Sequence, residues 1–512
     1  MKTLVFFLSL LLLVTSPLLA QDYQDGPELP SVDEVEPDEN DNISNADDLG
    51  KLVKDAEPQN EPDLAEPEDD QTPKADDSDI EKPKEGESNN DVVVIPPPST
   101  VDNDPIIPEK QTAPHDGVNV ILLVADDLGV GDLGCYYGEK TSAPRICRLA
   151  KEGIRFTDFS APAPDSQSSQ RALLTGKRFT KNLSAFGLAA LAKKNGYQTA
   201  FWGQWLLGTE SAPMPTDDGF DLFWGVTTPA DNWSFHPIAG ELNPPIKLWN
   251  NNAVVGYNVN PESYTTHIAS RVVKFIKEKR DVPFFACVFF TSPRVPLVNQ
   301  QEDAYREAVS ELDRAVGDIV DAVDQAGIAE STLIVFLSDN GPNRAWGSQA
   351  GDTGPYRADI GFEGSVRVPC IMRWKNRVKP AEYCHFVNQL DVAPTVAQLW
   401  GVPSDEFGKR EGKSLVDVLN GKTDQLIYKS FAYFSPDGKI LAVRAAKWKL
   451  YCPQEYKAVD SSQDVKPGTP APYTIKKIDW ELYDLSADPG ETTPKNDANP
   501  EVFEAIKKAI KQ

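Results

Sequence analysis

The sequence predicts an α/β fold with a mostly parallel central sheet flanked by helices, followed by a small C-terminal antiparallel α+β subdomain. Three features indicate this fold: continuous apolar runs, segments with helical spacing between them, and a change of pattern after Gly401. Continuous apolar runs are typical of strands that are buried on both faces, as in parallel sheets. Strands that alternate with helices favour an α/β architecture.

The elements of the main domain follow from these patterns. Strands are predicted at Asn119–Val124, Ile154–Phe159, Thr199–Trp202, Phe284–Phe290 and Leu333–Leu337. Helices are predicted at Cys147–Gly153, Arg171–Leu174, Leu188–Lys194, Tyr264–Glu278 and Glu302–Gln325. The helix that ends at Gln325 is the clearest, because its apolar residues recur every three or four positions.

The C-terminal part has a different pattern. Short strands are predicted at Lys439–Val443, Trp448–Tyr451 and Trp480–Leu485, and a terminal helix at Glu501–Lys511. Short strands that are joined by turns favour antiparallel pairing. We therefore predict a main α/β domain over residues 116–400 and a C-terminal subdomain over residues 401–512.

The N-terminus has the pattern of a secretory signal peptide. Lys2 precedes the apolar stretch Leu4–Val14, and the small residue Ala20 marks the expected cleavage position. The apolar stretch is too short to span a bilayer comfortably. The sequence therefore predicts an exported protein (periplasmic, cell-surface or extracellular) with a signal peptide over residues 1–20 and no membrane span after cleavage.

Residues 21–115 are predicted to form a disordered acidic spacer that is rich in proline. They contain 29 acidic and 6 basic residues, and their net charge of −23 accounts for most of the −27 of the whole chain. Such a segment buries too little apolar surface to offset its ordering entropy. Residues 116–512 carry a net charge of only −5 and show no basic stripe, which argues against nucleic-acid binding.

Polar residues follow two of the predicted strands and form a candidate metal site. Asp126 and Asp127 end the first strand, and Asp339 and Asn340 follow the strand Leu333–Leu337. Ligands of open α/β sheets bind at the carboxyl ends of strands, so these four side chains are expected to converge. Carboxylate and amide oxygens suit Ca²⁺, and also Mg²⁺, better than zinc.

The surroundings of these residues resemble the sulfatase family of the alkaline-phosphatase-like superfamily. The resemblance rests on Val124–Gly129, Gly131–Gly134, Leu149–Phe156, Leu173–Gly176, Gly196–Ala200, Gly219–Asp221, Leu337–Gly341, Phe362–Pro369, Asp391–Thr395, Glu481–Leu485 and Asp488–Glu491. These motifs run in family order from about Val118 to the C-terminus, so the resemblance implies the family's fold and its calcium site.

The resemblance also implies a mechanism. In the family, a Cys or Ser within C/S-x-P-S-R is converted to formylglycine, and the hydrate of that residue attacks sulfur. Ca²⁺ and several cationic side chains hold the sulfate oxygens. Charge that builds on these oxygens needs preorganised positive groups, and the departing oxygen needs a general acid.

The residue that would be modified falls on Ser166, counted back from Leu173–Gly176. The motif's Pro is Ser168 here and its Arg is Gln170, so the sequence lacks the pattern that favours conversion of Ser166 to formylglycine. Arg171 lies one residue further, and on a helix its side chain would point about 100° away.

Other catalytic positions are also altered. The Lys and His of the family's G-K-W-H-L-G stretch are Gln204 and Leu206, and the His of its P-H-x-P stretch is Arg294. The Lys before E-G-G falls on Ala358 or Asp359. Arg294, Gln204 and Arg171 remain as candidate substrate-binding residues, although an arginine cannot act as a general acid near pH 7.

Three hypotheses follow, because the metal-ligand positions match the family while several catalytic positions do not. Losing one such group costs about 10²–10⁴ in rate, so several losses together predict a pseudoenzyme, inactive or strongly impaired. It would keep its metal site and bind a sulfated polysaccharide or another sulfate ester. The second hypothesis is an active sulfatase or phosphatase-like hydrolase that uses Ser166 with reassigned helper residues. The third is a non-catalytic interaction module.

Overall fold

The computed structural model describes residues 117–138, 143–179, 187–208, 213–229, 232–278, 281–299, 301–460 and 468–510. The predicted signal peptide and acidic spacer lie outside the described residues, so both stay predictions. Within the described ranges, no helix is both long and apolar enough to cross a lipid bilayer.

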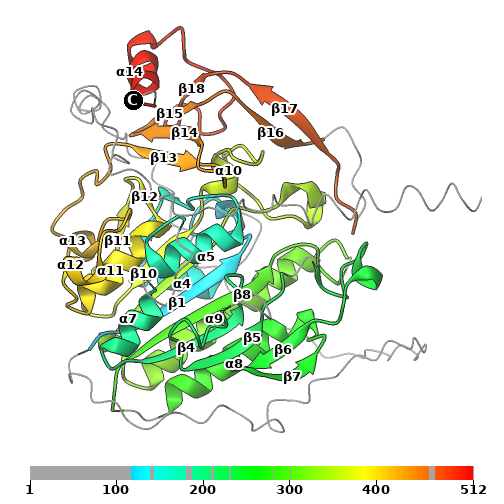
Figure 1. The fold of residues 1–512 in the computed structure, drawn as a ribbon, viewed down its shortest axis with the longest axis vertical. Coiled ribbons are helices and arrows are strands. Elements are labelled where there is room, and N and C mark those ends of the chain that lie inside the picture. The colour runs from blue at the N-terminus through cyan, green and yellow to red at the C-terminus, as the bar shows by residue number, and fades with distance from the viewer. Residues whose placement is uncertain are drawn as a thin grey trace, which may run out of the picture.

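Ten of the described strands form one central sheet (Figure 1). Their order is β11 (Ala381–Tyr383), β2 (Ile154–Phe156), β10 (Cys370–Arg373), β9 (Thr332–Ser338), β1 (Asn119–Asp126), β8 (Phe284–Pro293), β4 (Gln198–Gln204), β5 (Leu222–Val226), β6 (Lys247–Asn250) and β7 (Ala253–Tyr257). Neighbours from β9 to β5 are parallel, whereas β10, β6 and β7 pair antiparallel with their neighbours. The predicted mostly parallel sheet is confirmed.

Helices cover both faces of this sheet. Alternate residues of β1 contribute to two cores: Ile121 and Leu123 to one, Val120 and Leu122 to the other. The first core is closed by α4 (Pro144–Glu152), α8 (Pro261–Lys277) and α9 (Ala304–Gln325). The second core is closed by α5 (Ser166–Thr175), α7 (Leu188–Lys194) and α11 (Val392–Leu399). Burial on both faces explains why the central strands are continuous apolar runs.

A smaller antiparallel sheet follows the main domain, as predicted, and lies beyond it in Figure 1. It contains β13 (Phe431–Phe434), β14 (Ile440–Ala445), β15 (Trp448–Tyr451) and β18 (Glu481–Asp484). The hairpin of β16 (Gln454–Val459) and β17 (Tyr473–Ile478) and the helix α14 (Pro500–Ile510) complete this part. The short helices α12 (Ser404–Phe407) and α13 (Val416–Leu419) instead add Phe407 and Leu419 to the main-domain core.

A buried ion network joins the two parts of the chain. Lys449 Nζ of β15 lies 2.8 Å from Glu363 Oε1 of α10 (Glu363–Val366), and neither side chain is exposed to solvent. Arg367 Nη2 contacts the other Glu363 oxygen at 2.7 Å. Although burial favours the neutral acid, the surrounding cations Lys449, Arg367 and Arg444 hold the pKa of Glu363 well below its ordinary value.

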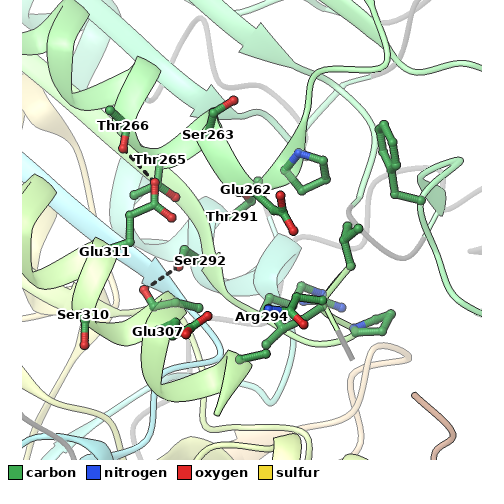
Figure 2. A pocket seen from close by; sticks show the side chains of 18 of the residues that line it. Glu262, Ser263, Thr265, Thr266, Thr291, Ser292, Arg294, Glu307, Ser310 and Glu311 are labelled. Atoms are coloured by element: carbon green, nitrogen blue, oxygen red, sulfur yellow. Dashed lines mark hydrogen bonds between the residues drawn. The ribbon is translucent and has the colours of Figure 1, made fainter. Parts of the chain in front are cut away.

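Two cavities meet near the carboxyl end of β8. One, of about 630 Å³, lies between the carboxyl ends of the central strands and the C-terminal hairpin, and its lining includes Ser166 and Tyr473. The other, of about 910 Å³, is lined mainly by residues of α8, α9 and the segment after β8, including Glu262 and Glu307 (Figure 2). Arg294 lines both cavities.

Candidate active site

Neighbouring parallel strands deliver the polar residues of the candidate site. Asp126 and Gln204 are the last residues of β1 and β4, Arg294 directly follows β8, and Asp339 and Asn340 directly follow β9. Because β9, β1, β8 and β4 lie side by side in one direction, their carboxyl ends meet at the same edge of the sheet. The convergence expected from the sequence is therefore present in the fold.

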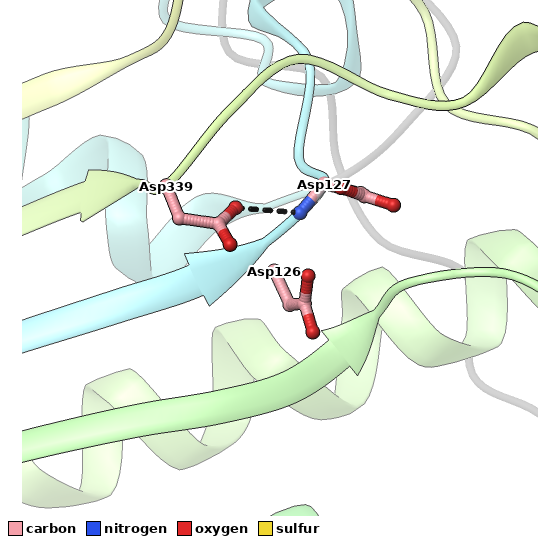
Figure 3. A group of neighbouring side chains, drawn as sticks. All are labelled: Asp126, Asp127 and Asp339. Carbon is pink, nitrogen blue, oxygen red and sulfur yellow. Dashed lines mark hydrogen bonds between the residues drawn. The ribbon is translucent and has the colours of Figure 1, made fainter. Parts of the chain in front are cut away.

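Three of the four predicted metal ligands form a compact carboxylate cluster. Asp126, Asp127 and Asp339 each offer an oxygen, and these atoms all lie within 4.8 Å of one another (Figure 3). All three residues are buried. Oxygens on opposite sides of a Ca²⁺ ion are about 5 Å apart, because each ligand lies 2.3–2.6 Å from the ion. The spacing and chemistry of this cluster therefore fit such an ion.

Local backbone geometry fixes the cluster. Asp127 has a φ of 60°, in the left-handed region that aspartate tolerates better than most residues. In this conformation its backbone N–H donates to Asp339 Oδ1 at 3.0 Å (Figure 3). The same oxygen accepts the Asn340 N–H at 2.7 Å, and the Asn340 amide donates to Asp127 Oδ1. The segments Asp126-Asp127 and Asp339-Asn340 thus hold each other in place through these hydrogen bonds.

The cluster is short of positive charge. Burial raises the pKa of Asp126 well above its ordinary value, Arg294 opposes that shift, and the carboxylates of Asp339 and Asp127 reinforce it. Burial also raises the pKa of Asp339. A bound cation would relieve this repulsion, because an opposite charge favours the ionised carboxylates.

A buried carboxylate also shapes the loop after Asp127. Asp132 accepts the Gly129 and Asp352 backbone N–H groups and the Tyr305 hydroxyl, each at 2.8 Å. Burial raises the pKa of Asp132 to about 7. A side chain at Gly129 would collide with the Asp352 carbonyl oxygen, which explains the glycine there.

Ser166 lies beside the cluster, at the first position of α5. Asp165 caps this helix by accepting the Ser168 N–H at 2.8 Å. The Ser166 Oγ lies 3.4 Å from Asp126 Oδ1 and 3.4 Å from Asn340 Oδ1. The residue that the sequence places at the nucleophile position therefore faces the candidate metal ligands.

The Arg294 side chain is directed at the same group. Its Nη1 lies 3.0 Å from Asp126 Oδ1 and 3.6 Å from Asp127 Oδ1. The same nitrogen donates to Ser166 Oγ at 3.1 Å. Arg294, which the sequence offers as a candidate substrate-binding residue, lines the 630 Å³ cavity and pairs with the carboxylates.

Neutral groups occupy the side of the cavity near β4. The Gln170 amide donates to the Gln204 carbonyl at 2.9 Å and accepts the Leu206 N–H at 2.8 Å, so it holds this segment in place. Gln204 and Leu206 both line the 630 Å³ cavity. Gln204 Oε1 is buried without a hydrogen-bond partner in the described part of the chain.

Two other arginines, Arg171 and Arg357, make no contact with the carboxylate cluster in the described part of the chain. Arg171 does not belong to the lining of the 630 Å³ cavity, and burial lowers its pKa. Arg357 pairs with Asp359 at 2.8 Å, and it also donates to the Tyr456 hydroxyl at 2.7 Å. Ala358 lines the cavity but carries no charge.

The structure adds three cavity residues that sequence reasoning missed. Asn343 and Arg344 follow β9 through the Gly341-Pro342 turn, and Tyr473 reaches the cavity from the C-terminal hairpin. The Tyr473 hydroxyl donates to Asn343 Oδ1 at 2.7 Å. Nothing in the sequence marks the contact between Asn343 and Tyr473, which lie far apart along the chain. The short separation of Arg344 from Asn340 is the one signal that could have indicated an arginine near the site.

Comparison with known proteins identifies the family. The model of the Sulfatase family matches residues 118–402 of the chain. Human arylsulfatase A is 30% identical over 445 residues, which cover 76% of this chain and 86% of that protein. An N-acetylgalactosamine-6-O-sulfatase from Bacteroides thetaiotaomicron is 25% identical over 481 residues and covers 77% and 92% of the two chains.

Solved structures share the fold. A sulfatase from Pseudoalteromonas sp. aligns with a TM-score of 0.65 at 24% identity, covering 77% of this chain and 90% of that chain. The phosphonate monoester hydrolase of Agrobacterium radiobacter aligns with a TM-score of 0.52 at 17% identity, covering 76% and 94%. Because the family model spans more than half of the chain and its relatives align over most of it, the chain belongs to the sulfatase family, within the alkaline-phosphatase-like superfamily.

Proposed function

We propose that this chain is an exported sulfatase-family protein that keeps a Ca²⁺-type metal site, binds a sulfated polysaccharide or another sulfate ester, and hydrolyses it poorly or not at all. The observation that best supports this proposal is that one cavity combines a carboxylate cluster with neutral residues at expected catalytic positions. Three buried carboxylates lie within 4.8 Å of one another, while Gln204, Leu206 and Ala358 supply neutral lining where the family resemblance implies cations.

The metal would be held by Asp126, Asp127, Asp339 and Asn340. When bound, it would supply positive charge to the oxygens of a sulfate group. Arg344 lines the same cavity and offers a planar set of donors that suits an oxyanion. Gln204 Oε1 would accept a hydrogen bond from a ligand hydroxyl, such as one of a sugar ring.

Hydrolysis is limited by the residues that stand where the family resemblance implies Lys and His. Ester cleavage needs a group that gives a proton to the departing oxygen. Glutamine, leucine and alanine cannot do so at neutral pH, and the proton of Arg294 does not leave there. Each missing group is expected to lower the rate by about 10²–10⁴, although the losses are not additive.

The test compares binding with turnover in the same preparation. The protein, supplied with Ca²⁺, is expected to bind a sulfated polysaccharide more tightly than the desulfated form of the same polymer, and this difference should shrink as salt rises. Sulfate release should not exceed that of Ser166→Ala. Equal affinity for both polymers would contradict the ligand class, and turnover that depends on Ser166 would contradict the loss of hydrolysis.

One observation favours a second candidate, a hydrolase that attacks directly with Ser166. The Ser166 hydroxyl lies at the N-terminus of α5 and within 3.4 Å of Asp126 Oδ1, an arrangement that would suit a nucleophile beside a metal. Direct attack predicts turnover of a phosphate or sulfate ester that Ser166→Ala abolishes while the serine stays chemically unmodified. A purely non-catalytic interaction module would show neither turnover nor metal binding.

A further inference from the structure

One nitrogen of Arg294 lies where three candidate site oxygens meet. Nη1 is 3.0 Å from Asp126 Oδ1, 3.6 Å from Asp127 Oδ1 and 3.1 Å from Ser166 Oγ. Two of these oxygens belong to carboxylates that a divalent ion would need. An ion bound to Asp126 Oδ1 would lie within about 6 Å of the guanidinium, since its own bond to that oxygen is 2.3–2.6 Å long. Like charges at this distance repel each other.

We propose that Arg294 is a built-in cation that competes with the divalent metal for the carboxylate cluster, an inference that rests on the proposed metal site. With the guanidinium on Asp126 and Asp127, part of the cluster's negative charge is already neutralised. Metal binding then requires the side chain to leave those oxygens. The apparent affinity for the metal equals the intrinsic affinity multiplied by the fraction of molecules in which Arg294 has left the cluster.

The structure offers a place for the displaced side chain. Arg294 also lines the 910 Å³ cavity, to which Glu262 and Glu307 contribute carboxylates (Figure 2). A short rotation of a long, flexible side chain would move its charge from one group of carboxylates to the other. Arg294 would thus have an inward state on the cluster and an outward state in the larger cavity.

A buried polar side chain also belongs to the lining of the smaller cavity. Gln204 lines this cavity, and its side-chain Oε1 is buried without a hydrogen-bond partner among the described residues. Buried polar atoms are seldom left unpaired in folded proteins. Asp127, Ser166 and Asn340 line the same cavity, so the cluster borders a lined cavity and does not stand alone as a group of acidic residues.

The direct test is calorimetric titration of Ca²⁺ into the metal-free full-length protein and into Arg294→Ala, with Arg294→Gln as a second uncharged variant. Removing the competing cation is expected to tighten Ca²⁺ binding at least about tenfold. It should also enlarge the rise in melting temperature at a fixed Ca²⁺ concentration. Unchanged affinity would overturn the proposal, and weaker binding would show that Arg294 supports the ion.

Two controls separate this inference from the metal site itself. Arg344→Ala removes an arginine that lines the same cavity but whose Nη1 donates to the Gly351 carbonyl, and its effect on Ca²⁺ affinity should stay below about threefold. Asp126→Asn should weaken Ca²⁺ binding strongly. If neither the parent protein nor Arg294→Ala binds Ca²⁺, or if Asp126→Asn binds normally, the proposed metal site fails and the competition fails with it.

A double-mutant cycle tests the outward state. Glu307→Gln removes a carboxylate from the larger cavity, so it should weaken Ca²⁺ binding in the parent protein, where Arg294 has to move outward. In the Arg294→Ala background the same change should have little effect. An equal effect in both backgrounds would contradict the displacement of Arg294 into that cavity.

Discussion

Neutralising one carboxylate of the cluster should stabilise the metal-free protein and remove its response to metal. In Asp339→Asn, the side-chain oxygen can still accept the Asp127 and Asn340 N–H groups, because both bind Oδ1 in the parent structure. The change therefore keeps the local hydrogen bonds and removes a negative charge. This separates the electrostatic effect of Asp339 from its structural role.

The expected magnitude follows from the spacing of the cluster. Two carboxylate charges at the upper limit of this spacing, 4.8 Å, repel each other by roughly 3 kcal/mol at an effective dielectric constant of about 20. Arg294 already relieves some of this repulsion. Asp339→Asn should thus raise the free energy of unfolding without metal by about 1–3 kcal/mol. At Ca²⁺ 100-fold above its dissociation constant, the parent should gain about 2.7 kcal/mol, and the variant far less.

The assay is urea unfolding with a chelator and with saturating Ca²⁺. Asp318→Asn is a matched control, because its exposed side chain pairs with Arg145 at 2.6 Å and lines neither cavity, and its stability should change by less than about 1 kcal/mol. Its response to Ca²⁺ should equal that of the parent. The reasoning would be refuted if Asp339→Asn were less stable than the parent in chelator. It would also be refuted if Ca²⁺ raised the free energy of unfolding of the variant as much as that of the parent.

The remaining predictions concern stability. Lys449→Met removes one of the three cations around the buried Glu363, so the free energy of unfolding should fall by up to about 3–5 kcal/mol, and a loss below about 1 kcal/mol in urea titration would contradict that role. Burial raises the pKa of both Asp132 and Asp391 to about 7 from an ordinary 3.8. Between these values the folded state keeps protons that the unfolded state releases, so stability should fall as pH rises from about 4 to 7. Asp391→Asn should flatten the decline in melting temperature, and an unchanged slope would exclude Asp391 as its source.

The central strands and the metal-type cluster could be predicted from local sequence signals. Phe284–Phe290 is apolar throughout because β8 is buried on both faces, and the same burial makes Leu333–Leu337 recognisable as β9. Since both strands run parallel to β1, the polar residues that end or follow them had to share one edge of the sheet. The helix α9 was equally clear from its spacing.

Elements without such signals were missed. The strands β6 and β7 lie at the sheet edge, where β7 is largely exposed, so their residues lack a continuous apolar run. The approach of Tyr473 to Asn343 depends on how the C-terminal hairpin packs, which no local pattern encodes. The direction of Arg294 is a rotamer choice between two cavities, and the sequence could only place the residue after β8.

The central claim, a sulfatase fold that keeps its metal ligands while its chemistry is lost, is tested most directly at Ser166. The measurement is sulfate release from an aryl sulfate in Ca²⁺ by the parent protein and by Ser166→Ala, with mass analysis of the Ser166 peptide from the same sample. The account predicts an unmodified serine and equal background release by both proteins. A peptide that has lost two hydrogens to form formylglycine, together with turnover that Ser166→Ala abolishes, would contradict it.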